Sequence, residues 1–255
     1  MQNKTPPPSP TRRIIRLDHT DSTNRLVLET PEFLEENHLV VLARSQTQGR
    51  GRRGRSWVSL PGSQLLFSYV HHPQGIRGDL PVISLVAGLS VAQALEEFGA
   101  APRLKWPNDV KLAGKKVCGI LVETKPGPQG DPRVVIGIGL NCLGREEELP
   151  LEIKSIAAIL AAHTVQPVDP EAVLWTVLAC LDENLERLGA GEKPSLLESW
   201  RARADLAGKP VRVEGETVYS GRAVGISPEG YLLVEASGEL RTVVSGDVTW
   251  LDTPG

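Results

Sequence analysis

The chain has 255 residues, of which 40% are hydrophobic and 23% are charged, and its formal net charge is −3. This balance is typical of a soluble globular protein, and it excludes a general attraction to nucleic acid or to a membrane surface. The length favours one large domain together with a small one.

The first residues, MQNKTPPPSPT, are rich in proline and contain no apolar segment. We expect residues 1–11 to form a disordered tail, because a signal peptide would need an apolar core. RRIIRL then predicts a short strand, and DSTNRLVLE predicts a helix with Ser22 or Thr23 as its N-cap. HLVVLA and QLLFSYV predict two further strands, which the polar segment RSQTQGRGRRGR separates.

A long helix is expected over residues 80–98. Glycine and polar residues interrupt its apolar sequence, which predicts a buried helix and no membrane span. RLKWPNDV follows, with Pro107 marking a strand end or an irregular turn. KLAGKKVCGILVE predicts a hairpin with its turn at Gly114, and RVVIGIGLN predicts the strand after it.

Helical patterns run from Ser155 to Ala204. After Gly208 the segments KPVRVEG, TVYSGRAVGIS, YLLVEAS and ELRTVVSGDVTWL predict four or five short strands that form a small barrel. Hairpins and helices are mixed along the main part of the chain, which favours an α+β fold class. We therefore expect a tail over 1–11, a main domain over 12–205 and a small barrel over 206–255.

The segment GRGRRGR, from Gly49 to Arg55, carries the glycine spacing of a dinucleotide-binding turn. Such a turn follows a strand directly and opens a helix, whereas RSQTQ precedes this segment and RSWVSLPGSQ after it has no helical period. We therefore interpret it as a mobile loop that is ordered by an anionic ligand, because arginine side chains bind carboxylate and phosphate. A loop that is merely solvated is the alternative.

Further candidates lie on the predicted strands. Lys105 is either a surface residue or a cation aimed at a carboxylate or phosphoryl oxygen. Gly137 and Gly139 leave one face of a strand bare, which is typical of close approach by a ligand or another backbone, with a bulge as the alternative. Asn141 ends that face and is placed to contact a purine edge, and Gly119 would clear space beside it.

Polar and aromatic residues flank the loop. Ser22 and Thr23 either cap a helix or offer hydroxyl groups to a ligand. Gln46 and Gln48 are suited to orient a polar, uncharged ligand group. Trp57 either packs in the core or closes over a planar ring.

The three cysteines, Cys118, Cys142 and Cys180, lie in apolar segments and form no C-x-x-C pair. They predict small buried side chains, and neither a zinc site nor a disulfide framework. Without a signal peptide, we expect a cytoplasmic protein.

DSTN, GRGRRGRSW, KWPNDV, KVCGILVE and GIGLN, in this order and spacing, resemble the biotin–protein ligases, which biotinylate carboxylase carrier domains. The resemblance runs from about Ile14 to Trp250. It implies a catalytic domain related to class II aminoacyl-tRNA synthetases, followed by a small SH3-like barrel. It also implies that biotin and ATP, with Mg²⁺ as cofactor, give biotinyl-5′-AMP, from which a lysine of the biotin carboxyl carrier domain of acetyl-CoA carboxylase takes the biotinyl group.

The same resemblance implies roles for individual residues, with Lys105 and Arg52 as the catalytic pair. Biotin would be bound by Ser22, Thr23, Asn24, Gln46, Arg50, Gly51, Arg52 and Lys105. ATP would be bound by Arg52, Arg55, Trp57, Lys105 and Asn141. Asn108 and Asp109 belong to the motif without a definite role, and the metal ligands stay unassigned. The loop would close over the adenylate and exclude water from it.

Two other functions stay open at this point. A lipoate–protein ligase shares the fold and the adenylate chemistry but needs no polar group for a ureido ring. A non-catalytic binding protein would use the small barrel, although GELRTVVSGDV offers no basic or aromatic platform for RNA. The twenty residues before Asp21 leave no room for the helix-turn-helix of those biotin ligases that repress transcription, so we expect no DNA partner.

Overall fold

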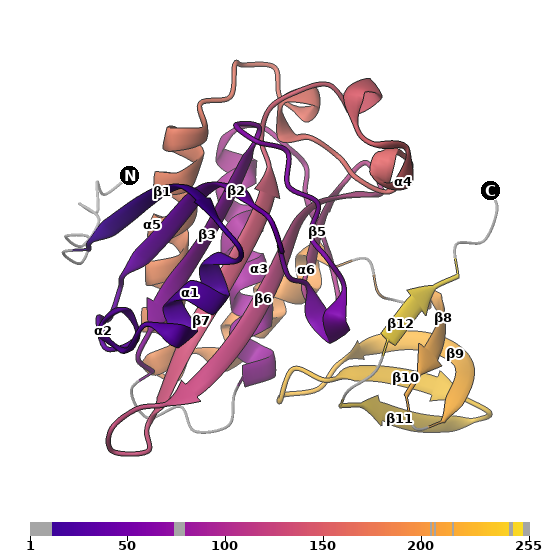
Figure 1. Cartoon of the computed structure of the whole chain (residues 1–255). Coiled ribbons are helices and arrows are strands. Elements are labelled where there is room, and N and C mark those ends of the chain that lie inside the picture. Colours follow the sequence, from indigo (N-terminus) through magenta and orange to yellow (C-terminus); the bar gives the residue numbers. More distant parts are fainter. Residues whose placement is uncertain are drawn as a thin grey trace, which may run out of the picture.

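A computed structural model describes residues 12–73, 80–204, 206, 208–215, 217–244 and 247–251. The predicted tail over 1–11 lies outside these residues. The described chain forms a seven-stranded mixed sheet in the order β1-β2-β3-β7-β6-β5-β4 and a five-stranded antiparallel sheet in the order β11-β10-β9-β8-β12 (Figure 1). All helices among the described residues precede the second sheet in the chain, and that sheet lies beside the first one at the C-terminal end of the chain.

The strands of the first sheet are β1 (Ile14–Thr20), β2 (Val40–Gln46), β3 (Gln64–His71), β4 (Arg103–Lys105), β5 (Asp109–Leu112), β6 (Lys115–Pro126) and β7 (Pro132–Asn141). The helices are α1 (Thr23–Glu29), α2 (Pro31–Leu34), α3 (Leu80–Glu97), α4 (Leu151–Lys154), α5 (Pro170–Gly189) and α6 (Lys193–Arg203), with 3-10 turns at Arg52–Gly54, Glu146–Glu148 and Leu160–His163. The second sheet holds β8 (Pro210–Glu214), β9 (Val218–Ile226), β10 (Leu232–Ala236), β11 (Glu239–Val243) and β12 (Asp247–Trp250).

Helices cover both faces of the first sheet near its centre (Figure 1). The long helices α3 and α5 pack on one face, where Phe67 and Tyr69 of β3 join the main hydrophobic core. The short helix α1 packs on the other face, where Val70 of the same strand joins a smaller core. Successive side chains of a strand point to opposite faces, and both faces of β3 are covered by helices. β3 is therefore buried along its whole length.

Two hydrogen bonds attach the second sheet to the first unit, one from the buried Trp106 and one from the exposed Arg201. The indole Nε1 of Trp106 donates a hydrogen bond to the carbonyl of Gly230 at 3.0 Å, and Arg201 donates to the carbonyl of Ile226 at 2.9 Å. Gly230 has a φ of +82°, and an added Cβ would lie 3.2 to 3.3 Å from Leu85 and Val82 of α3. The turn before β10 is therefore packed tightly against α3.

Several elements match the sequence predictions. The helix predicted over 80–98 is α3. It is apolar and long enough to cross a membrane, but 67% of its 18 residues are buried inside the protein. The predicted hairpin joins β5 to β6 through Ala113 and Gly114, which both have positive φ, as a tight hairpin turn requires. The strands predicted after Gly208 form five strands, within the predicted number.

One strand prediction is confirmed with shifted bounds, and one helix prediction is wrong. The strand predicted as HLVVLA is β2, which begins at Val40 and continues through Arg44, Ser45 and Gln46 in parallel register with β1. The segment 155–169 is largely non-helical, since its backbone pairs with Lys116: the Lys116 amide donates to the carbonyl of Ile156, and the Ala158 amide donates to the carbonyl of Lys116. The long helix instead begins at Pro170, where Asp169 caps it.

Candidate active site

A cavity of about 1000 Å³, with its open mouth included, lies on the α1 face of the first sheet. It is bounded by the start of α1, the segment after β2, the turn between β4 and β5, and the strands β6 and β7, and Val248 of β12 also reaches it. The predicted site residues that line it are Ser22, Thr23, Asn24, Gln46, Arg50, Gly51, Arg52, Arg55, Trp57 and Lys105. The structure therefore brings together residues that are up to 83 positions apart in the sequence, from Ser22 to Lys105.

The bare strand face predicted for β7 lies in this cavity. Gly137 faces the side chain of Asn24, and a Cβ at that position would lie 2.4 Å from Asn24 Oδ1. Gly139 and its cross-strand partner Gly119 face the indole of Trp57. A Cβ added at Gly139 would lie 2.7 Å from the nearest indole atom, and one added at Gly119 would lie 2.9 Å from the indole. Glycine is required at these positions, because any side chain would expel Asn24 or Trp57 from the sheet surface.

A cluster of polar groups surrounds the start of α1. Of the two predicted N-cap candidates, Ser22 is the N-cap of α1, and its hydroxyl accepts a hydrogen bond from the Arg25 amide. Gln46 Oε1 accepts from the Thr23 amide at 2.7 Å and from the Thr23 hydroxyl at 3.2 Å. The fully buried Ser68 of β3 lies beneath them, with its hydroxyl 2.8 Å from Thr23 Oγ1 and 2.6 Å from Asn24 Oδ1.

The segment after β2 forms a short hairpin, which we call the loop hairpin (residues 47–57). The Trp57 amide donates to the Gly49 carbonyl at 2.8 Å, and the Gly51 amide donates to the Arg55 carbonyl at 2.7 Å. Gly49 permits the close crossing of the two arms, since a Cβ there would lie 2.6 Å from the Trp57 carbonyl oxygen. Gly54 supplies a positive φ at the tip. The ordering of this segment by a ligand stays a prediction.

The cavity is strongly cationic. Its described lining includes one acidic side chain, Asp109, and six basic ones: Arg50, Arg52, Arg53, Arg55, Lys105 and Lys116. This excess contrasts with the net charge of −3 of the whole chain, so the positive charge is concentrated at the site. An anionic ligand would therefore be attracted to this cavity in particular.

Two lysines of the cavity have different settings. Burial lowers the pKa of Lys105 from its usual value, with Asp109 opposing the shift, so its charged form is poorly solvated and gains from an anionic partner. Lys116 Nζ pairs with Asp109 Oδ1 at 2.7 Å and lies 5.3 Å from the centre of the Trp57 ring. Lys116 was not singled out from the sequence, because KK in a hairpin is typical of an exposed strand.

Other polar residues at the site were also missed or are placed differently. Ser68 was missed, although a lone polar residue within LLFSYV is a usable signal. Asn108 lines the cavity and donates to the carbonyl of Ile120 at 2.6 Å. Asn141 does not reach the cavity lining: it is 4% exposed, accepts from Gln64 and donates to the carbonyl of Ala158. Its contact with a purine stays a prediction.

The cysteines lie outside the chemistry of the cavity. Cys118 and Cys142 are buried, as predicted, whereas Cys180 is only half-buried. Burial raises the pKa of the Cys142 thiol to about 12 and that of Cys180 to about 11. Both thiols are therefore protonated at neutral pH and are poor nucleophiles. Within the described ranges, no three His, Cys, Asp or Glu side chains gather as a metal site.

Comparison with known proteins matches both parts of the chain to families of protein ligases. Residues 17–141 match the biotin/lipoate A/B protein ligase family, and residues 207–249 match the biotin protein ligase C terminal domain. The fold and the cation-lined cavity thus define a protein ligase of the biotin and lipoate class.

The similarity to individual relatives extends over nearly the whole chain. The biotin–[acetyl-CoA-carboxylase] ligase of Paracoccus denitrificans is 34% identical over 91% of this chain and 98% of its own. The bifunctional ligase/repressor BirA of Bacillus subtilis is 30% identical over 93% of this chain and 74% of its own. The biotin protein ligase from Aquifex aeolicus, solved in complex with biotin and ATP, has a TM-score of 0.82 at 32% identity, over 94% and 99% of the two chains. The chain belongs to the biotin protein ligase family and is a ligase.

Proposed function

We propose that this ligase activates biotin with ATP to biotinyl-5′-AMP and transfers the biotinyl group to a lysine of a biotin carboxyl carrier domain. The observation that carries the proposal is the pairing of a neutral polar cluster with a cationic cluster along one bare strand face. Asn24 lies on Gly137, and Trp57 and Lys116 lie by Gly139 and Gly119. Two residues along a strand span about 7 Å, so one ligand can contact both clusters.

In the first step the biotin carboxylate attacks the α-phosphorus of ATP, a mixed anhydride forms, and pyrophosphate leaves. Two anionic groups must approach each other, so fixed cations lower the barrier. Lys105 and Arg52 are the proposed catalytic cations, and Lys116, which lines the same cavity, joins them. Arg55 and Trp57 would contact the adenosine part.

Mg²⁺ is proposed to accompany ATP. Asp109 is the one carboxylate in the described lining of the cavity, and its Oδ1 already pairs with Lys116. Mg²⁺ in nucleotide sites is commonly held by one or two carboxylates and by the phosphates themselves. The cavity fits an ion that enters on ATP, and bound there it would neutralise phosphate charge.

In the second step the neutral ε-amine of the acceptor lysine attacks the anhydride carbonyl, an amide bond forms, AMP leaves, and the nitrogen releases one proton to solvent. The anhydride must survive until the acceptor arrives. The loop hairpin carries Arg50, Gly51 and Arg52 over the cavity, and it is proposed to exclude water from the adenylate. This reaction requires no side-chain nucleophile.

The polar cluster favours biotin over lipoate. The ureido group of biotin offers one carbonyl and two N–H groups, and Ser22, Thr23, Asn24 and Gln46 supply both donors and acceptors around the cavity. Lipoate carries no such group and would make fewer hydrogen bonds to this cluster than biotin does, which weakens its binding. The finer fold assignments belong to the same proposal: a class II aminoacyl-tRNA synthetase-like unit over 12–205 and an SH3-like barrel over 206–255, in a cytoplasmic enzyme.

The proposal is tested by intact-mass spectrometry of a purified biotin carrier domain incubated with this protein, Mg-ATP, and either biotin or lipoate. We expect a gain of one biotinyl group that requires ATP, and no adduct with lipoate. A lipoyl adduct alone would keep the adenylate chemistry and contradict the ureido site. No adduct with either, on an acceptor that a known ligase modifies, would favour a non-catalytic binding protein.

A further inference from the structure

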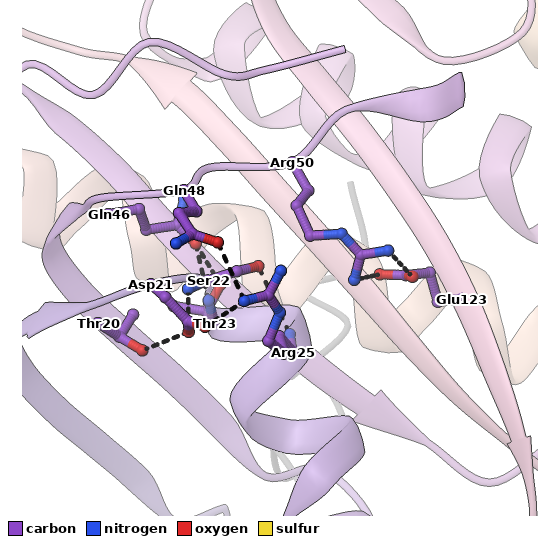
Figure 2. A network of polar contacts seen from close by, with 9 residues as sticks. All are labelled: Thr20, Asp21, Ser22, Thr23, Arg25, Gln46, Gln48, Arg50 and Glu123. Carbon is purple, nitrogen blue, oxygen red and sulfur yellow. Dashed lines mark hydrogen bonds and ion pairs between the residues drawn. The ribbon is translucent and has the colours of Figure 1, made fainter. Parts of the chain in front are cut away.

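Two carboxylates next to the cavity hold the base of the loop hairpin (Figure 2). On one arm, Arg25 of α1 donates to Asp21 Oδ2 at 2.7 Å and to Gln48 Oε1 at 3.1 Å. On the other side, Arg50 extends from the hairpin to Glu123 of β6. Sequence reasoning assigned no role to either carboxylate, and Glu123 is the more informative of the two.

Glu123 uses both of its oxygens. Its Oε1 pairs with Arg50 Nη2 at 2.9 Å, and its Oε2 accepts from Asn24 Nδ2 at 2.9 Å and lies 3.4 Å from Arg50 Nη1. The side chain of Glu123 is 21% exposed, against 40% for Arg50. One partly buried carboxylate therefore joins a residue of the loop hairpin to a residue of the polar cluster.

Glu123 and the backbone carbonyl of Leu121 together orient the Asn24 amide, because Asn24 Nδ2 donates to Glu123 Oε2 at 2.9 Å and to the Leu121 carbonyl at 3.2 Å. An ionised carboxylate only accepts hydrogen bonds, so the NH₂ group of Asn24 must face Glu123. The Oδ1 atom is then turned toward Gly137, where Ser68 donates to it at 2.6 Å. With a reversed amide, the two oxygens would face each other and repel.

The charge balance of the cavity gives Glu123 a second effect. Six basic side chains line the cavity beside one carboxylate, and their mutual repulsion opposes a closed loop hairpin before an anionic ligand arrives. Glu123 offsets the charge of Arg50 at the base of the hairpin. A charge-assisted pair of this kind resists opening more than a neutral hydrogen bond does.

We propose that Glu123 is a positioning residue that couples the polar cluster to the loop hairpin: it holds Arg50 and so slows opening of the hairpin before a ligand binds, and together with the Leu121 carbonyl it orients Asn24. The first part is independent of the ligand's identity. The second part rests on the proposed function, because its effect is read in the binding of biotin.

The first experiment is limited proteolysis of the full chain by trypsin without ligand, with peptides assigned by mass spectrometry. Trypsin cleaves after arginine, so cuts at Arg50, Arg52, Arg53 and Arg55 report on opening of the hairpin. Glu123→Gln keeps the size of the side chain and removes its charge. We expect cleavage within 50–55 to become about fivefold faster, as for loss of one partly exposed ion pair.

Matched variants separate this effect from general destabilisation. Glu36→Gln removes an ion pair with Arg13, at residues that do not line the cavity, and should leave cleavage within 50–55 unchanged. Arg50→Gln removes the same ion pair by changing its more exposed partner, so it tests the pair even where Glu123→Gln folds poorly. Because it also removes the trypsin site at Arg50, the variants are compared by cleavage after Arg52, Arg53 and Arg55. If Glu123 acts through Arg50, adding Glu123→Gln to Arg50→Gln gives no further acceleration. Equal cleavage of wild type, Glu123→Gln and Arg50→Gln would overturn the proposal.

The second experiment measures steady-state kinetics of biotin-dependent pyrophosphate release. Glu123→Leu, which removes the acceptor that glutamine would keep, is expected to raise KM for biotin about tenfold with a smaller change in kcat, because Asn24 then loses one of the two contacts that orient it and binds the ureido group less well. An unchanged KM in an active variant would overturn the coupling to Asn24 and leave the ligase assignment intact. A wild-type protein without such activity would instead contradict the proposed function, and the proteolysis result would still decide the role of Glu123 in the hairpin.

Discussion

Lys116 and Asp109 form an ion pair inside the cavity, with 2.7 Å between Nζ and Oδ1. The backbone of Lys116 is also fixed, since its amide and its carbonyl both hydrogen-bond to the segment Ile156 to Ala158. A cation held in this way is oriented before the phosphoryl group arrives, so little reorganisation is required during the reaction. The proposed chemistry therefore depends on Lys116 at least as much as on Lys105.

We expect Lys116→Ala to lower the rate of biotin-dependent pyrophosphate release by about 100-fold, the usual cost of removing one group that stabilises developing charge. The neighbouring Lys115 provides a matched control, because its Nζ pairs with Glu146 and it does not line the cavity. Lys115→Ala should leave the rate nearly unchanged, because Lys115 does not line the cavity and the loss of its ion pair affects stability by about 1 kcal/mol or less. Similar rates for the two variants would remove Lys116 from the mechanism.

Ser68→Ala tests the support of the polar cluster. Ser68 is fully buried, and its hydroxyl contacts both Thr23 Oγ1 and Asn24 Oδ1. Its loss leaves a buried acceptor without a donor, which costs about 1 to 3 kcal/mol. We expect KM for biotin to rise about tenfold with KM for ATP nearly unchanged, because biotin alone is proposed to contact Thr23 and Asn24.

The control for Ser68→Ala is Ser90→Ala on α3, a second buried serine, which contacts Asn184 on the far side of the sheet. Both variants should lose stability to chemical denaturation, but only Ser68→Ala should change KM for biotin. An equal rise of KM for biotin and for ATP in Ser68→Ala would show that the cavity as a whole had been disturbed.

Arg52→Gly tests the loop hairpin as a cover for the adenylate. Arg52 lies in the 3-10 turn at the tip of the hairpin and lines the cavity. Without its charge the adenylate should be held less tightly, so we expect biotinyl-5′-AMP to escape at least about tenfold faster than from wild type. The measurement is the rate of adenylate release into solution after rapid gel filtration. Retention as long as in wild type would contradict the role of the hairpin as a cover.

The sequence was sufficient to predict the elements that are marked by local signals. α3 is continuous and apolar, and the β5–β6 turn is marked by glycine, so both were located to within a residue or two. The bare face of β7 was also visible, because alternation along a strand places Gly137 and Gly139 together. These features depend on neighbouring residues and therefore leave a pattern in the chain.

The rest of the site depends on contacts between distant segments. Lys116 is directed into the cavity because Ile156 and Ala158, about forty positions later, bind its backbone. Glu123 joins Asn24 to Arg50 across 99 and 73 positions. Asn141 was expected at the ligand because it ends the bare face, but Gln64 and Ala158 engage its amide. No local pattern specifies such pairings, so single-sequence reasoning could not find them.

A buried histidine away from the cavity is expected to make the fold sensitive to acid. His71 at the end of β3 is 9% exposed, and neither ring nitrogen has a hydrogen-bond partner among the residues that the structure describes. Burial lowers the pKa of His71 to about 4, and the neighbouring His38 and His72 act in the same direction. In the unfolded chain the imidazole of His71 should titrate near the ordinary histidine pKa of 6.5.

The sign of the effect follows from proton binding. Above pH 6.5 the imidazole is neutral in both states and contributes no pH dependence. Between pH 6.5 and 4 the unfolded state binds the proton and the folded state does not, so the free energy of unfolding falls as the pH falls, by about 3 kcal/mol in total. His71→Leu removes this titration. Urea unfolding of both proteins at pH 8 and at pH 5 should show a smaller loss of stability in the variant. The difference between the two losses reports on His71, because the carboxylates that titrate in this range are the same in both proteins. An equal loss in both would mean that His71 is not buried in its neutral form.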